Sequence, residues 1–335
     1  MAIKANAVNS RVKGLQFDYS EIFQNRLAAN TEMAMLNRVM GRIPNTLNAR
    51  EADFHFFTAP PEFSLWEEGT KRRYGRLFDR TWKVPVLRYG TGIEWDRLDE
   101  EDDLTDRFRT QMEGISDKAI EIEIEAYFAI LSNTVNPQYL KAIPLGADGL
   151  PVFSAARTNY FPGGGNIVVG SGVSTPAQII TDYFRCRSRF KRVRDDANTR
   201  YFGEGIFKKG ITLVFDDIHM KTFTEAFKAK TIQGNAAAPE NIVATITEFG
   251  PVTFWGTSRL PAISPNTWYM ILDGQPEKGI FALERRDLGS EPETILKTEQ
   301  ESDRASDYDT RRLLFRKRLG FGVSLPLGMM QITNV

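Results

Sequence analysis

The chain has 335 residues, of which 41% are hydrophobic and 26% are charged, so it can bury one large core or two moderate ones and is not a disordered chain. Forty-three lysines and arginines balance 43 aspartates and glutamates. Proteins that hold nucleic acid by neutralising phosphates usually carry a basic excess, so this neutral chain would hold a polynucleotide by a local patch or simply enclose it. The single cysteine, Cys186, excludes an intrachain disulfide and a thiolate-rich metal site.

Residues 1–18 are polar and weakly periodic, and they predict an extended arm without the apolar region of a secretory signal. No later run approaches the ~20 apolar residues that a membrane helix needs, so we expect a chain that is made and kept in the cytosol. Apolar residues near a 3.6-residue period predict a helix over residues 21–39, which Gly41 and Pro44 end.

Residues 54–95 predict a long two-stranded ribbon, because the segment is rich in aromatic residues and its three prolines exclude a helix. A ribbon of this kind is not stable alone in water and needs a surface to lie on. Gly69 and Gly75 bracket a charged tip. Its basic residues are Lys71, Arg72, Arg73 and Arg76. Aromatic residues expected to bind a neighbour are Trp66, Tyr74, Phe78 and Trp82.

The clearest predicted element is one helix over residues 104–132, whose apolar residues recur every three or four positions. Its length would be about 43 Å at 1.5 Å per residue. An acidic run precedes it and consists of Asp99, Glu100, Glu101, Asp102 and Asp103. These carboxylates favourably oppose the helix dipole and offer a surface to a basic partner, and Asn133 with Pro137 ends the helix.

The second half of the chain predicts a mixed helix and strand region. Thr175, Pro176 and Gln178 form a helix start of the capping-box type, and that helix is expected to reach about residue 198. The remaining expected elements are loops over 137–172 with a strand at 167–169, a buried strand at 211–215, a short helix at 217–230, strands at 242–249, 268–272 and 280–285, a charged loop at 287–310, and a last strand around 315–325.

A search for chemistry in the sequence finds no catalytic, cofactor-binding or metal-binding set. His55 and His219 are the two histidines, and no serine elbow accompanies them. The glycine clusters lack the residues of a phosphate-binding loop. One dense basic segment lies in the helix after Pro176, and it contains Arg185, Arg187, Arg189, Lys191, Arg192 and Arg194. These side chains surround the helix, so salt bridges to acidic neighbours are favoured over contact with DNA.

The order of elements resembles the HK97-like major capsid proteins of tailed bacteriophages. Four segments are similar, more narrowly, to the Mu-type major head subunits, and they are residues 63–69, 93–95 with the acidic run, 148–157 and 210–215. The resemblance implies an α+β fold with a discontinuous peripheral (P) domain and an axial (A) domain. Its implied units are an N-terminal arm with a helix (1–53), the E-loop ribbon and its base (54–92), a P domain with a long spine helix (93–150), an A domain (151–306) and a C-terminal strand that returns to the P domain (307–335).

The same resemblance implies a function as a structural protein of the virion, not an enzyme. Its copies would form hexamers and pentamers of an icosahedral shell around double-stranded DNA, with no cofactor and no membrane, and assembly would take place in the host cytoplasm. Portal, scaffold and decoration proteins are the further partners implied, and the scaffold is expected to be a separate protein. Two alternatives stay open, namely the shell of an encapsulin compartment and, in a different class, an α+β enzyme with an unrecognised site.

Overall fold

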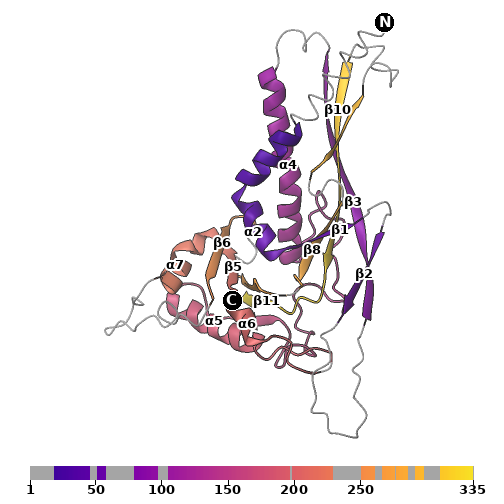
Figure 1. The fold of residues 1–335 in the computed structure, drawn as a ribbon. Helices are drawn as coiled ribbons and strands as arrows, with labels where there is room; N and C mark the ends of the chain where they lie inside the picture. Colours follow the sequence, from indigo (N-terminus) through magenta and orange to yellow (C-terminus); the bar gives the residue numbers. More distant parts are fainter. Residues whose placement is uncertain are drawn as a thin grey trace.

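Two β-sheets and a set of helices make up the fold of this computed structural model. The structure describes residues 19–45, 51–57, 79–96, 105–196, 198–228, 250–260, 266–275, 277–285, 291–297 and 310–334. In Figure 1 the six-stranded sheet, its long helix and the helix of residues 31–39 form one part of the molecule, and the five-stranded sheet with the helices of residues 176–228 forms the other.

The six-stranded sheet joins segments from both ends of the chain. Its order is β1-β8-β10-β3-β2, and β9 pairs with β10 beside this path. The strands are β1 (Gly41–Asn45), β2 (Glu51–Phe57), β3 (Asp79–Asp96), β8 (Ile280–Arg285), β9 (Glu293–Lys297) and β10 (Thr310–Val323). β1 and β8 are parallel, whereas the other neighbours are antiparallel.

The five-stranded sheet has the order β4-β11-β7-β5-β6. Its strands are β4 (Ile167–Val169), β5 (Ile211–Asp216), β6 (Val252–Thr257), β7 (Trp268–Leu272) and β11 (Met329–Thr333). Side chains alternate between two cores, since Leu213 and Phe215 belong to one cluster and Val214 to the other. Both faces of this sheet are therefore buried, which explains the continuous apolar runs of its central strands.

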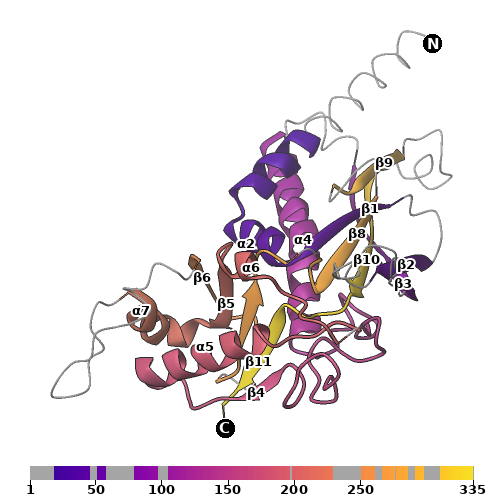
Figure 2. The ribbon, with the colours of Figure 1, turned by 60° about the horizontal axis from the view of Figure 1, so that its bottom comes forward.

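Helices cover both faces of the five-stranded sheet. α5 (Pro176–Phe190) and α7 (Met220–Lys228) contribute to the core on one face, while α2 (Thr31–Val39) and α4 (Thr105–Leu131) contribute to the core on the other. In the chain the short element α6 (Glu204–Phe207) precedes β5, and η1 (Asp217–His219) follows it. Figure 2 shows α5 and α7 on the side of the five-stranded sheet away from α2 and α4.

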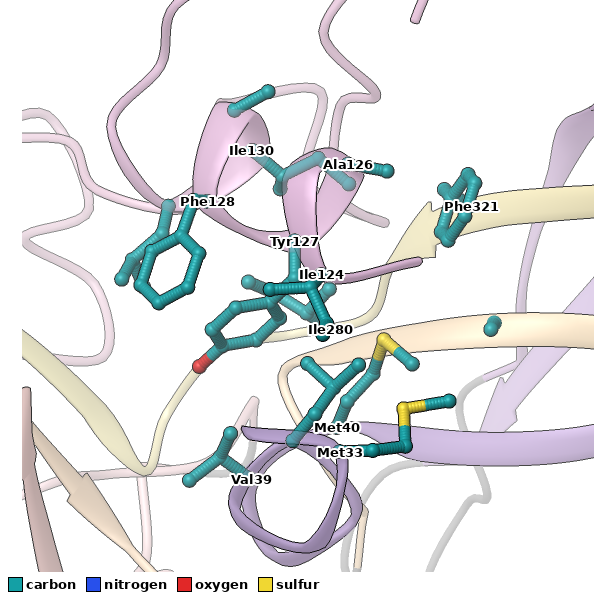
Figure 3. Close-up of a cluster of buried hydrophobic side chains, with 14 of the residues drawn as sticks. Met33, Val39, Met40, Ile124, Ala126, Tyr127, Phe128, Ile130, Ile280 and Phe321 are labelled. Atoms are coloured by element: carbon teal, nitrogen blue, oxygen red, sulfur yellow. The ribbon is translucent and has the colours of Figure 1, made fainter. Parts of the chain in front are cut away.

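The expected long helix is confirmed as one unbroken element, because α4 runs through all 27 residues without interruption. At 1.5 Å per residue it is about 40 Å long. Figure 3 shows Ile124 and Tyr127 of α4 directed toward Met33, Val39 and Met40, and all five side chains are buried. Tyr127 also stacks on Trp255 of β6, with ring centroids 5.8 Å apart. α4 thus packs against both parts of the fold.

Two predicted helices have different bounds in the structure. The helix expected over residues 21–39 is two helices, residues 19–29 and α2, because Asn30 is extended and its side chain accepts a hydrogen bond from the backbone N–H of Met33 at 2.9 Å. The helix expected to reach residue 198 ends at Phe190. There the chain turns so that Val193 is buried, and Arg194 pairs with Arg200 in an isolated bridge.

Several strands also differ from the sequence prediction. The charged loop expected over 287–310 contains β9, whose residues 293–297 pair with residues 312–316 of β10. β11 was not predicted and lies in the five-stranded sheet, so the expected unit 307–335 divides between the two sheets. β8 and β9, expected in the unit 151–306, lie in the six-stranded sheet. The strand predicted at 242–249 is outside the described residues.

Candidate assembly elements

The base of the predicted ribbon is formed by β2 and the first part of β3. Residues 51–57 pair with residues 79–85, and residues 86–96 of the same strand pair with β10. β3 therefore runs from the ribbon into the six-stranded sheet (Figure 1). Val84, Phe281 and Leu283 form a small buried cluster where the two meet. This cluster anchors the ribbon base to its own subunit.

Among the four ribbon aromatics that are expected to bind a neighbour, Trp82 is the one whose side chain the structure describes. It is half-buried and meets the Phe281 ring edge-on, with centroids 6.4 Å apart. Within this subunit it therefore packs on the ribbon base. Trp66, Tyr74 and Phe78 lie outside the described residues, as do the tip residues Lys71, Arg72, Arg73 and Arg76 and the acidic run Asp99, Glu100, Glu101, Asp102 and Asp103.

Two arginines of the basic segment bind the open edge of the five-stranded sheet. Arg189 donates from Nη1 to the carbonyl of Ile167 at 2.9 Å, and Arg185 donates from Nη1 to the carbonyl of Val169 at 2.8 Å. β4 is the end strand of this sheet, and its ladder to β11 uses the carbonyl of Asn166 and the N–H of Gly170. Alternate residues of a strand present their backbone groups to opposite sides, so the carbonyls of Ile167 and Val169 point away from β11.

The other members of the basic segment have varied surroundings. Arg185 also lies 3.9 Å from the buried carboxylate of Asp182, and Lys191 lies 3.4 Å from Glu204. Arg194 donates to the carbonyl of Asn198 at 3.4 Å. Arg192 is exposed, and Arg187 lowers the pKa of Tyr183, although burial outweighs it and raises that pKa to about 12. Within the chain, Arg185 and Lys191 therefore pair with carboxylates, and Arg194 binds a backbone carbonyl.

A buried cluster of four charged residues was not predicted from the sequence. It consists of Arg42 of β1, Glu123 of α4, Glu284 of β8 and Lys317 of β10. Glu123 is 0% exposed and Lys317 is 4% exposed. Lys317 Nζ lies 2.7 Å from one carboxylate oxygen of Glu123, and Arg42 lies 2.6 Å from the other. Arg42 also pairs with Glu284. We name these residues the four-charge cluster.

The charges in this cluster balance one another. Burial raises the pKa of Glu123, but Lys317 and Arg42 outweigh burial and hold that pKa below its ordinary value. Burial lowers the pKa of Lys317, and Glu123 opposes that effect. The sequence carries a weak signal of the cluster. Lys317 occupies an inward position between Phe315 and Leu319, and Glu123 lies between the two apolar stripes of α4.

Two further arginines organise neighbouring segments. Arg259, after β6, lies 2.9 Å from Glu32 and also pairs with Glu121 and Glu125 of α4. Arg157 is 1% exposed and lies 2.6 Å from Asp148. Its guanidinium also donates to the carbonyls of Pro151 and Val152 and to the side chain of Asn166. Arg157 therefore holds the loop of residues 148–166 in one conformation.

The sequence prediction of no metal site concerns residues throughout the chain, and the structure describes part of them. No group of three or more His, Cys, Asp or Glu within the described residues could hold a metal ion. His219 is the last residue of η1. None of the helices in the described ranges has the length and apolar character that would let it cross a membrane.

Comparison with known proteins identifies the fold through structure and not through sequence. No family model matches the chain, and no curated protein matches it. The capsid of Ralstonia phage GP4 is similar at a TM-score of 0.55 and 11% identity, covering 88% of this chain and 86% of that chain. The capsid of the myovirus XM1 is similar at a TM-score of 0.52 and 10% identity, covering 90% of this chain and 92% of that chain. The capsid of cyanophage P-SCSP1u is similar at a TM-score of 0.51 and 12% identity, covering 89% of this chain and 86% of that chain. The chain therefore has the α+β, HK97-like fold of phage capsid proteins.

Proposed function

We propose that this chain is a major capsid subunit, whose copies form the hexamers and pentamers of an icosahedral shell around double-stranded DNA. The observation that carries the proposal is the fold, which matches phage capsid proteins over about nine tenths of both chains. The sequence offers no catalytic set beside it. In this role the chain is a structural protein of the virion and needs no cofactor.

The ribbon and the charge balance support the same role. β3 leads from the six-stranded sheet into a two-stranded ribbon whose base has a small core of its own. We expect the aromatic and basic residues further along the ribbon, such as Trp66 and Arg72, to bind a neighbouring copy. A net charge of zero weakens repulsion between copies that pack side by side.

The finer assignment to the Mu-type head subunits is part of the proposal. Four sequence segments support it, and one of them, residues 148–157, contains the buried pair Asp148–Arg157. In this assignment residues 1–53 are the arm, 54–92 the E-loop and 93–150 the P domain with α4 as its spine. Residues 151–306 are the A domain except for β8 and β9, and 307–335 are the return to the P domain except for β11, since these strands lie in the other sheet. Portal and scaffold proteins, and decoration proteins where present, complete the partners.

The proposal is tested by expressing the chain together with the genes that flank its own and isolating fast-sedimenting material. Electron microscopy should show closed shells of one size, and nuclease treatment of filled particles should leave DNA protected. Shells that enclose cargo enzymes and no DNA would identify an encapsulin compartment instead. A monomer that forms no particle under any of these conditions would contradict the proposal and favour the enzyme alternative.

A further inference from the structure

The four-charge cluster joins four elements that are far apart in the sequence. Arg42 belongs to β1, Glu123 to α4, Glu284 to β8 and Lys317 to β10. Three of these elements are strands of the six-stranded sheet, and the fourth is the long helix that packs on it. The cluster is thus the place where polar contacts fix the helix to the sheet inside the core.

Stability alone does not account for charges in this position. Glu123 and Lys317 have lost their hydration here, and Glu284 and Arg42 have lost most of theirs. The mutual attraction of the four charges has to offset that cost. Apolar side chains of similar size often stabilise a core equally well or better. Loss of a single partner, in contrast, leaves an uncompensated buried charge. A buried ion cluster can add direction to an apolar core, because its hydrogen bonds form only when its members are correctly placed.

The contacts define the position of α4 in two respects. Lys317 Nζ donates both to the carbonyl of Ala119, at 2.8 Å, and to the carboxylate of Glu123, at 2.7 Å. These two acceptors are one helical turn apart, so a slide of α4 by one turn, about 5.4 Å, would separate Glu123 from Lys317. The second carboxylate oxygen binds Arg42 at 2.6 Å, which fixes the rotation of the helix toward β1.

Arg42 of β1 connects α4 with β8 and α2. Its guanidinium pairs with Glu284 of β8 and donates at 2.6 Å to the side chain of Asn37 in α2. Apolar contacts between α4 and the sheet, such as those around Ile120 and Ile124, are non-directional and would tolerate small shifts. The hydrogen bonds of the four-charge cluster are directional, so they weaken when α4 shifts.

We propose that the four-charge cluster is a positional lock, which selects one placement of α4 on the six-stranded sheet and so gives every copy the same shape. The consequence for assembly rests on the proposed capsid function. Copies with one placement of α4 present the same contact surfaces in hexamers and in pentamers and close into shells of one size, whereas copies with a variable α4 would present variable contact surfaces.

The first test measures the placement of α4 in the isolated subunit. Glu123→Leu with Lys317→Met removes one anion and one cation, keeps the cluster neutral and leaves Arg42 paired with Glu284. Spin labels at Gln111→Cys on α4 and Arg88→Cys on β3 report the distance between helix and sheet. Both positions are exposed, and native Cys186 is buried. We expect the width of the distance distribution to increase at least twofold, while the denaturation midpoint stays at or above that of the parent.

A matched control carries the same exchange next to the cluster. Glu293→Leu with Arg316→Met removes a half-exposed pair that joins β9 to β10. The control should keep the narrow distance distribution of the parent. If the distance distribution of the cluster variant is as narrow as that of the parent, the positional lock is wrong. If the cluster variant unfolds or loses most of its stability, the cluster acts through stability and the proposal is also wrong.

The second test examines the particles. The cluster variant should give shells of mixed diameter under conditions in which the parent and the control give one diameter. A cluster variant that forms shells of one parental diameter overturns the link to assembly. If the parent itself forms no shell but the spin-label widths differ as expected, the capsid proposal fails and the lock on α4 is supported.

Discussion

The side chain of Arg157 binds several groups of the loops after α4. It is buried, it pairs with Asp148, and it supplies hydrogen bonds to two backbone carbonyls and to Asn166. Arg157→Met would leave the Asp148 carboxylate in the interior without its cation and would remove one donor from each of the other acceptors. We expect the free energy of unfolding to fall by about 3–5 kcal/mol, measured by chemical denaturation.

A surface arginine provides the comparison. Arg192 is exposed, and Arg192→Met should change the free energy of unfolding by no more than about 0.5 kcal/mol. Equal losses for the two substitutions would show that the Arg157 contacts contribute no more than an exposed side chain does.

Single buried charges show where the sequence could and could not be used for prediction. The alternation along β10 places Lys317 on the inward face, and the helical period places Glu123 between two apolar stripes, so both positions can be recognised as buried. Their pairing depends on the contact between β10 and α4, which are almost 200 residues apart in the sequence. Arg42 and Glu284 follow from the same long-range contacts, and no local pattern marks them.

At the scale of elements, α4 contains one residue that weakens it without a structural reason. Gly114 is exposed, and a Cβ at this position would have no atom within 4 Å. Gly114→Ala should therefore stabilise the chain by up to about 1 kcal/mol, because alanine has the higher helix propensity. The thermal midpoint would rise. Gly322→Ala is the opposite control, since its Cβ would lie 2.3 Å from the Phe281 ring, and it should destabilise the chain. A lower midpoint for Gly114→Ala would contradict this account.

Two arginines of α5 bind the backbone of β4, the strand at the edge of the five-stranded sheet. Open strand edges pair readily with other chains, and charged side chains are one common protection. Here Arg185 and Arg189 occupy the outward carbonyls of β4, while the Val169 side chain is 69% exposed. Arg185→Met with Arg189→Met should expose an apolar edge and produce irregular aggregates, measured by light scattering and by thioflavin fluorescence.

The control for this variant again uses the same basic segment. Arg192→Met removes a positive charge just after α5 without uncovering a strand carbonyl, and it should remain as soluble as the parent. Aggregation of both variants would point to a loss of surface charge and not to the β4 edge.

Local signals predicted the elements better than their ends. The capping box before α5, the period of α4 and the apolar runs of β5, β7 and β8 all correspond to observed elements. The break at Asn30 was missed because a strong apolar period continues across it. β9 was missed because charged residues flank it, and its pairing with β10 is a tertiary contact that a local pattern does not show.

On the scale of the whole molecule, charge is segregated although the net charge is zero. Asp99 to Asp103 form an uninterrupted acidic run, and Lys71, Arg72, Arg73 and Arg76 crowd within six residues of the ribbon tip. Four like charges at a tip repel one another unless an anionic surface neutralises them. We expect the acidic run of an adjacent copy to be that surface. Exposed ion pairs contribute only ~0–1 kcal/mol each, so the tip would direct and align copies, while buried ribbon aromatics would provide adhesion at ~25 cal/mol per Å².

Reversal of the tip charge tests this arrangement. Arg72→Glu with Arg73→Glu should leave the subunit folded but slow its assembly at low salt, because steering between exposed charges is strongest there. Lys208→Glu with Lys209→Glu is the matched control, since both lysines are exposed and lie far from the ribbon in the sequence. A tip variant that assembles at the parental rate with the parental salt dependence would refute the role of the tip. Adding Asp102→Arg and Asp103→Arg to the tip variant should restore the rate. A slow tip variant without such restoration would place the acidic partner elsewhere on the neighbouring copy.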